Sequence, residues 1–321
     1  MNNLTKKIQQ CATMLTATTC ILLSAQSFAA IEIAESLPSD NVTNVSINNH
    51  SGLINVVGWN KDKISVTGTL DDDAEQLIFE QKGAQVLINV EYSKMDNWSA
   101  DGSKITVFMP KNIRMKSSSV SSDIHLSNLH GGVEVITVSG DVLAKNISQN
   151  VELSSISGNI DSDNLSGKLS LSAVSGDIED TGSTGRLEIR SVSGEVDINS
   201  KAKEVFFNNV SGQSKLSLAE VIELRIRTVS GDLQAKLILN EKSLLKASTV
   251  SGDLAFTFQQ DVDADFSLKS SVGGDIDNNI TKAKTEHDEY GPGAELNFQT
   301  VNGSALVRVS TVSGNIEVNS K

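Results

Sequence analysis

A short phrase, valine or isoleucine followed by serine and glycine, returns through the middle of the chain at a fixed spacing. It begins at Val138 and recurs at a constant interval as far as Val210, after a looser first copy at Val120. A fixed period near twenty residues is the signature of a solenoid, in which each repeat supplies one layer. Less regular copies follow at Val229, Val250, Val272, Val301 and Val312. The repeat therefore predicts a stack of similar coils.

The pattern inside one repeat predicts strands. Counting from Val174, the apolar residues Ile178, Leu187 and Ile189 stand at offsets 4, 13 and 15 with polar residues between them. Apolar residues two apart indicate a half-buried strand. Glycine and its Ser, Asp or Asn neighbours favour a bend. We expect two short strands with corners in each 18-residue coil of a parallel β-solenoid. The expected corner glycines are Gly140, Gly158, Gly176, Gly194, Gly212, Gly231 and Gly252.

A left-handed hexapeptide helix has a coil of the same length, but it requires an aliphatic residue at every sixth position. At offset 12 the successive copies carry only polar residues, which excludes this alternative. These residues are Asn150, Lys168, Arg186 and Glu204.

Residues 1–29 form a separate segment. Lys6 and Lys7 precede an apolar, Thr-rich run that ends at Ser27-Phe28-Ala29, with small residues at the −3 and −1 positions. This pattern predicts a secretory signal peptide cleaved after Ala29, with Ala30 as the alternative. Cys20 raises the alternative of a lipoprotein, but the residues before it, Ala17-Thr18-Thr19, are poorly suited to lipidation. The run is too short and too Thr-rich to predict a permanent membrane span, so we expect none in the mature chain.

Charge and cysteine content limit the partners. Both cysteines lie in the predicted signal, so no disulfide or thiolate site is expected after cleavage. Without the two signal lysines, 25 basic and 40 acidic residues remain, a net charge of −15. This acidity argues against nucleic acid and anionic lipid as partners, since both require basic patches. Aromatic residues make up only 4% of the chain, which is low for a stacking glycan cleft.

The remaining chain divides into a head and the coils. Residues 30–110 predict a β-meander that covers the first coil, with a hairpin turn at Lys82-Gly83. Residues 111–321 predict the coils, and residues 296–319 are expected to close the stack. The expected head strands are 42–48, 53–57, 63–69, 77–80, 85–92 and 104–109. We expect one all-β solenoid with this cap.

The longest interruption of the repeat lies between Val272 and Val301, where residues 281–295 are in excess. This polar segment contains Gly-Pro-Gly and predicts a loop that protrudes from the stack. Loops on a rigid scaffold commonly carry function. His287, Tyr290 and Pro292 are therefore our candidates for a partner-binding site.

The residue after each corner glycine forms a mostly acidic column. Its members are Asp123, Asp141, Asn159, Asp177, Glu195, Gln213, Asp232, Asp253 and Asp275, and Asp161, Glu179, Asp197 and Asp277 stand two positions further on. Neighbouring coils would lie about 4.8 Å apart, and salt screens like charges at a surface. We interpret the column as turn chemistry, with weak binding of divalent cations as the alternative.

Catalysis finds little support in the sequence. The acids follow the repeat instead of forming an irregular cluster, and the four histidines are scattered: His50, His125, His130 and His287. We therefore expect no catalytic residue, no cofactor and no metal site. The alternative is a glycan-active β-helix enzyme with an acid pair that breaks the repeat.

The repeated VSGD, VSGN and VSGE phrases resemble those of the bacterial DUF4097 family, whose members are also labelled candidate adhesins. Residues 49–59 are similar to that family's opening strand and residues 105–110 to its entry into the repeats, and the resemblance covers residues 42–320. It implies a β-solenoid in the cell envelope and carries no catalytic residues. We expect a non-enzymatic exported binding or scaffolding module, periplasmic or extracellular, for an envelope protein or glycan. The other alternative is a purely structural periplasmic spacer.

Overall fold

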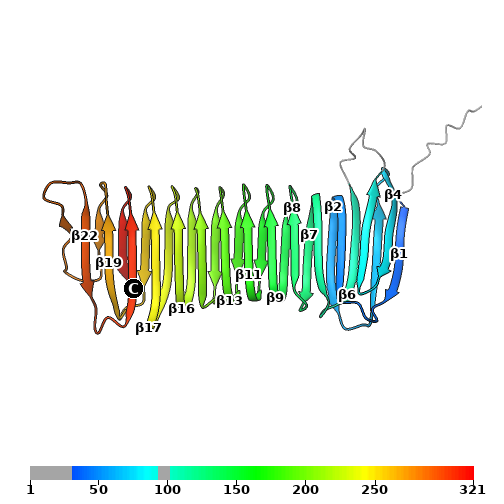
Figure 1. Ribbon diagram of the computed structural model, residues 1–321, viewed down its shortest axis with the longest axis horizontal. Helices are drawn as coiled ribbons and strands as arrows, with labels where there is room; N and C mark the ends of the chain where they lie inside the picture. Colours follow the sequence, from blue (N-terminus) through cyan, green and yellow to red (C-terminus); the bar gives the residue numbers. More distant parts are fainter. Residues whose placement is uncertain (1–30, 93–101) are drawn as a thin grey trace, which may run out of the picture.

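The computed structural model describes residues 31–92 and 102–321, and every regular element within these ranges is a β-strand. The 24 strands lie side by side along the long axis of the molecule and keep a similar orientation (Figure 1). The protein is all-β and solenoid-like, as predicted. The predicted signal peptide lies outside the described residues. Within those residues no helix is found that could span a membrane.

The coils are built from two kinds of stretch, one that leads into each valine corner and one that follows it. In the longest strands a single element contains both stretches. The strands of the coils are β7 (Arg114–Leu129), β8 (Val133–Thr137), β9 (Val142–Ser155), β10 (Ile160–Asp163), β11 (Ser166–Ala173), β12 (Ile178–Thr181), β13 (Thr184–Ser191), β14 (Val196–Ser200), β15 (Glu204–Asn209), β16 (Ser214–Thr228), β17 (Leu233–Thr249), β18 (Leu254–Phe258), β19 (Ala264–Ser270) and β20 (Ile276–Asn278).

Successive coils pair in parallel with the register that the repeat predicts. Leu169 lies opposite Leu187, one period later, and Ile160 lies opposite Ile178. Equivalent residues therefore stack into columns that run along the molecule. After β15 the steps lengthen, and β16 and β17 take up the extra residues at register shifts near Glu220 and Glu223.

The core lies between the two stretches of each coil. Along β11 and β13 buried aliphatic residues alternate with outward polar residues, so that Leu169, Leu171, Leu187 and Ile189 all face inward. The inward residues of all coils form one continuous hydrophobic cluster, which extends into the head. Burial on this scale is the main stabilising term in a chain whose described residues include no cysteine.

A second corner depends on residues that accept a left-handed backbone. Asn128, Asn146 and Asn164 have φ angles of 58°, 54° and 56°, and Gly182 follows in the same column with φ 74°. Asparagine and glycine adopt this region more readily than other residues. The Asn164 side-chain amide also donates to Asn146 Oδ1 at 2.7 Å, which links consecutive coils.

The head continues the stack, and the predicted meander is only partly correct. It consists of β1 (Ile31–Pro38), β2 (Asn44–Trp59), β3 (Lys63–Leu70), β4 (Ala74–Lys82), β5 (Gln85–Tyr92) and β6 (Ser103–Pro110). β4 and β5 form the expected hairpin, and β1 and β3 pair antiparallel. However, β2 pairs in parallel with β5, β6 and β7, so β2 is itself the first coil. Its alternating burial continues the core, which a separate cap would interrupt.

The C-terminal end also differs from the prediction. It contains β21 (Glu286–His287), β22 (Ala294–Gln299), β23 (Ala305–Thr311) and β24 (Ile316–Ser320). β23 pairs in parallel with both β17 and β19, and β24 lies between β18 and β20. The last copy of the repeat is therefore inserted one layer inside the stack, and Figure 1 marks the C-terminus within the row of strands. β22, antiparallel to β19, forms the outer layer instead, and the short β21 pairs along its far side.

Candidate binding surfaces

A column of small buried residues stands immediately before the outward-facing residue at each corner, which is valine or isoleucine in most layers. Its hydroxyl members hold the turn: Ser155 Oγ accepts a hydrogen bond from the Gly158 amide at 2.8 Å, and Ser119 Oγ accepts one from the Ser122 amide at 2.8 Å. Such local bonds are typical of Ser and Thr at turns. The members of this small buried column are Asn49, Ser119, Thr137, Ser155, Ala173, Ser191, Asn209, Thr228, Thr249, Thr311 and Ser270.

The corner glycines are required chiefly by the approach of the neighbouring layer. A Cβ on Gly176 would lie 2.0 Å from the Gly158 carbonyl oxygen, and one on Gly158 would lie 2.0 Å from the Gly140 carbonyl oxygen. The sequence predicted that these glycines allow a bend. This reason applies to Gly194 and Gly212, which have φ angles of 124° and 106°. At Gly176 φ lies outside the left-handed region, so close stacking excludes a side chain there.

The leading aliphatic residue of each corner points into solvent. These residues are between 36 and 48% exposed, whereas the aliphatic residues four positions later are buried. β-Branched side chains stacked layer on layer make an apolar ridge along one edge of the molecule. We call this ridge the aliphatic column: Val120, Val138, Ile156, Val174, Val192, Val210, Val229, Val250 and Val312.

The acidic column has a structural role in the layer contacts. Asp141 Oδ1 accepts a hydrogen bond from the Asn159 amide at 2.7 Å, and Asp177 Oδ1 accepts one from the Glu195 amide at 2.7 Å. Asn159 Oδ1 accepts equally from the Asp177 amide, at 2.9 Å, so the contact requires an oxygen acceptor and no charge. The same contact links Asp232, Asp253, Asn315 and Asp275. These bonds join one layer to the next, so contacts between layers explain the column, where the sequence analysis expected bonds within each turn.

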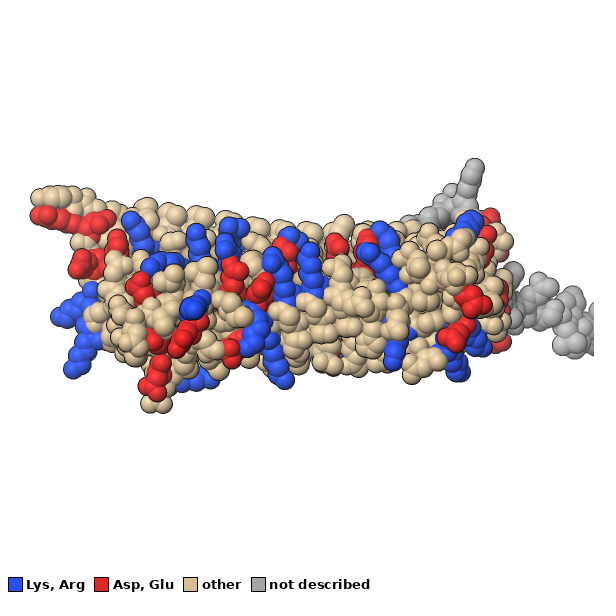
Figure 2. Space-filling view, turned by 60° about the horizontal axis from the view of Figure 1, so that its bottom comes forward, with Lys and Arg blue, Asp and Glu red and all other residues tan. Residues whose placement is uncertain are grey.

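Asp161 belongs to the row of acids two positions after the acidic column, and burial and neighbouring charges shift its pKa. Partial desolvation and repulsion from Asp141 raise the pKa of the Asp161 carboxyl, with Lys145 opposing them. In the part of the chain that the structure describes, no group of three or more His, Cys, Asp or Glu residues could hold a metal ion. Weak cation binding along the row stays a prediction. Figure 2 shows acidic and basic side chains interspersed along one face of the stack.

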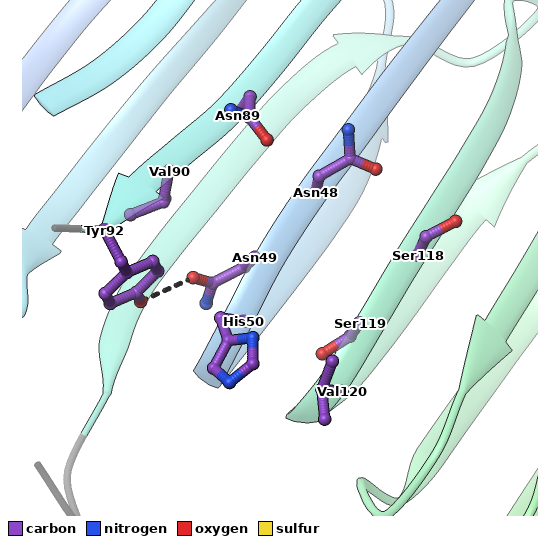
Figure 3. Close-up of a pocket in the computed structure, with 9 residues that line it drawn as sticks. All are labelled: Asn48, Asn49, His50, Asn89, Val90, Tyr92, Ser118, Ser119 and Val120. Carbon is purple, nitrogen blue, oxygen red and sulfur yellow. Dashed lines mark hydrogen bonds between the residues drawn. The ribbon is translucent and has the colours of Figure 1, made fainter. Parts of the chain in front are cut away.

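A hollow of about 390 Å³ lies where the head meets the coils (Figure 3). Asn48, Asn49 and His50 on β2 form its middle, with Ser118, Ser119 and Val120 of β7 on one side and Asn89, Val90 and Tyr92 of β5 on the other. Tyr92 OH donates to Asn49 Oδ1 at 2.9 Å, and the His50 and Tyr92 rings meet edge to face with centroids 5.9 Å apart. Amide, hydroxyl and ring groups therefore converge here.

His50 occupies the valine position of the first coil. Asn49 pairs with Ser119 and Ser51 with Ser121, which places His50 opposite Val120. Asn49 likewise takes the place of the serine in the small buried column and is 3% exposed. The hollow is thus the first corner of the stack with polar and aromatic substitutions. The degenerate phrase Asn49-His50-Ser51-Gly52 is the signal in the sequence that marks it.

Two further hollows lie at the corners in the middle of the stack, and the first of them is lined in part by the aliphatic column. The first, of about 410 Å³, lies on the side of the incoming strands and includes Arg190 and Arg227 beside Val192 and Val229. The second, of about 250 Å³, lies past the glycine and includes Glu195 and Asp232. Arg190 and Glu195 belong to one corner, and Arg227 and Asp232 to another. The same corners thus carry a basic residue before the exposed valine and an acidic residue after it, although Lys215 also lines the second hollow, 3.7 Å from Asp197, and Arg190 pairs with Glu188 on its own strand.

Asp180 on β12 is a carboxyl inside the core, which the sequence analysis did not single out. Its side chain is completely buried, and its Oδ1 accepts hydrogen bonds from Ser162 Oγ at 2.6 Å and Ser183 Oγ at 2.5 Å. Desolvation raises the pKa of Asp180, although the two hydroxyl donors oppose this shift. Asp180 lines none of the hollows described above.

The candidate loop is an ordered hairpin on the last layer. Glu286 and His287 of β21 pair with Glu295 and Ala294 of β22, and the Asp288 amide donates to the Gly293 carbonyl at 2.9 Å. Its base is tied down, since Thr285 Oγ1 donates to the Ile276 carbonyl at 2.8 Å. Tyr290 at the tip is 94% exposed. The predicted residues His287, Tyr290 and Pro292 are thus brought together on one projecting hairpin, all exposed.

Matches among solved structures include three bacterial proteins. A candidate cell adhesion protein from Clostridium sporogenes matches 91% of this chain and 100% of its own, with 9% identity and a TM-score of 0.26. A candidate lipid binding protein from Parabacteroides distasonis matches 89% and 96%, with 14% identity and a TM-score of 0.43. A candidate adhesin from the same species matches 90% and 97%, with 14% identity and a TM-score of 0.41. No curated protein matches the chain.

The family comparison is more specific than the structural one. The model of the Toastrack DUF4097 family matches residues 42–319, which include the first coil, every copy of the repeat and the inserted C-terminal strands. The chain therefore belongs to the Toastrack DUF4097 family.

Proposed function

We propose that the protein is an exported, non-enzymatic β-solenoid that acts as a binding module of the cell envelope. The observation that carries this proposal is the end hairpin, residues 286–295. It holds Tyr290 almost fully exposed at the end of a rigid stack, and aromatic anchors commonly dominate recognition surfaces. The predicted signal peptide supports export into the envelope.

The acids support a binding role over catalysis. The carboxylates in the acidic hollow, Glu195, Asp197 and Asp232, belong to columns that follow the repeat. Several acids of the same column already accept amide hydrogen bonds between layers. A glycan-active enzyme would require an acid pair placed for one substrate. A single parallel solenoid then serves as a rigid support for recognition, and the alternative of a plain spacer assigns no role to the hairpin.

The test targets the tip and leaves the base of the hairpin intact. A photoreactive phenylalanine analogue at position 290 should cross-link to a discrete envelope component in living cells. The same analogue at Ile222, which is 56% exposed on the coils, is the matched control. Digestion of the product with protease or with glycan hydrolases then identifies a protein or a glycan partner. Equal products at both positions would contradict a site on the hairpin.

Two further measurements address export and catalysis. Mass spectrometry of the protein from the cell envelope should give Ala30 as the first residue. Incubation of the purified protein with envelope polysaccharides should release no new reducing ends and no unsaturated sugars. Release of either product would favour the enzyme alternative.

A further inference from the structure

The aliphatic column is an apolar surface that solvent contacts over most of the length of the coils. From Val120 to Val312 it spans nine layers, or roughly 40 Å at the spacing of parallel strands. Single exposed aliphatic residues are ordinary, but a continuous row of this length marks an interaction surface. The row is continuous because the amide after each member donates to the carbonyl of the member in the preceding layer, as Ser139 does to Val120 and Ser313 to Val250.

The partner of such a row has to present apolar groups with the same repeat. A second copy of this chain does so by construction, because its own column has the spacing of the same parallel layers. When two copies lie parallel and in register, every layer of one meets the same layer of the other. No accumulated mismatch then limits the length of the contact.

Charge selects one orientation of the two copies. The ridge carries Arg190 and Arg227 on one flank and Glu195 and Asp232 on the other, in the same two corners. A two-fold axis parallel to the stack exchanges the flanks, so that the basic flank of each copy meets the acidic flank of the other. An axis across the stack would instead bring basic flank against basic flank. The last layer repeats the pattern with Lys269 and Asp275.

We propose that the protein forms a parallel two-fold dimer along the aliphatic column. The valines of each copy pack against the same valines of the other, and Arg190 and Arg227 of each copy face Glu195 and Asp232 of the other across the interface. The contact is isologous, as is usual for homodimers. The dimer is independent of the end hairpin and of any envelope ligand.

Single cysteines provide the first test, because the chain from Ala30 onward contains all the described strands and no cysteine. In the parallel dimer each aliphatic position lies near its own symmetry mate at every layer. Val138→Cys, Val192→Cys and Val250→Cys should therefore all form disulfide-linked dimers under mild oxidation. Ile222→Cys and Ile238→Cys are the controls, since these exposed residues lie outside the column.

The pattern of cross-links decides between arrangements. Cross-links at only one of the three column positions would indicate an antiparallel contact and overturn the proposal. Equal cross-linking of the controls would indicate random collision and overturn it as well. No cross-link at any position, with a monomer in sedimentation equilibrium, would show that the column has another role. Binding of fatty-acid or phospholipid vesicles to that monomer would identify a lipid as the occupant.

A charge-pair test uses the corner that lies between the two charged ones and is neutral on both flanks, Asn208 and Gln213. The double variant N208R/Q213E places opposite charges face to face in the parallel dimer and should lower the dimer dissociation constant roughly fivefold. The variant N208E/Q213E places like charges there and should raise it by a similar factor. Both effects should shrink at high salt. Equal dissociation constants for the two variants would contradict the parallel arrangement.

Discussion

At the scale of single residues, the acidic column shows that an Asp side chain can be required as a hydrogen-bond acceptor and not for its charge. Asp177 accepts an amide hydrogen bond from the next layer, and Asn159 makes the same contact one layer earlier. The acidic column is therefore explained by hydrogen bonding between layers. The negative charge of the column is a by-product of these carboxylate acceptors, and salt screens it.

We expect Asp177→Asn to change the free energy of unfolding by only a few tenths of a kcal/mol, and Asp177→Ala to lower it by about 1 kcal/mol. The asparagine oxygen still accepts from the Glu195 amide, whereas alanine leaves that donor without its partner. Urea unfolding of the three proteins measures both differences. A loss for asparagine as large as that for alanine would show that charge matters after all.

The buried Asp180 makes stability depend on pH. Because burial raises its pKa in the folded state, the folded protein holds this proton more tightly than the unfolded chain. Its contribution is therefore most favourable at low pH and is lost as the pH rises from the ordinary Asp range through the folded pKa. The carboxylate form is the costly one in the core.

Asp180→Asn should remove this dependence, since the amide cannot ionise and its oxygen can still accept from Ser162 and Ser183. The variant should gain stability relative to the parent protein as the pH rises from 4 to 7. Urea unfolding at several pH values measures the difference. A constant difference across this range would contradict a raised pKa.

At the scale of elements, the inserted C-terminal strands hold the far end of the stack together. β23 and β24 bridge neighbours that the chain otherwise leaves apart, and they bury Val307, Val309, Ile316 and Val318. The ring pair Phe266 and Phe298, stacked at 4.5 Å, lies in the adjoining outer layers. A late part of the sequence thus supplies a layer between two earlier ones.

Deletion of residues 300–321 should lower the free energy of unfolding by several kcal/mol, since full burial of one aliphatic side chain contributes about 1.5–3 kcal/mol. It should also expose strand edges on β17 and β19, which favours aggregation. Urea unfolding and light scattering measure the two effects. A truncated protein as stable and monodisperse as a variant lacking only Ser320 and Lys321 would contradict the role of the insertion.

At the scale of the whole molecule, the coils are equivalent layers, and the stack should tolerate the loss of one. Deletion of residues 156–173 removes one full period and brings together faces with the same register. We expect a soluble protein that unfolds cooperatively. Deletion of residues 156–164 alone removes half a period, places a strand against a corner and should prevent folding. Circular dichroism with urea unfolding compares the two, and equal stability would argue against the layered register.

The sequence by itself determined the period, the class and the inward face of the coils. Each copy of the repeat carries its own alternation and its own corner glycine, so the pairing of Leu169 with Leu187 follows from local chemistry repeated at a constant interval. The projection of residues 281–295 follows for the same reason, because a segment in excess of the period has no place in a layer.

Only the tertiary structure decided which layer each strand occupies and which groups meet between layers. The repeat phrase at Val312 does not reveal that β23 and β24 lie between earlier strands, since any free layer presents an equivalent ladder. Nor does the sequence show that the leading valines are exposed, or that His50 on β2 meets Tyr92 on β5. These features depend on contacts between layers. A periodic sequence does not specify such contacts uniquely, because each repeat can pair with several similar neighbours.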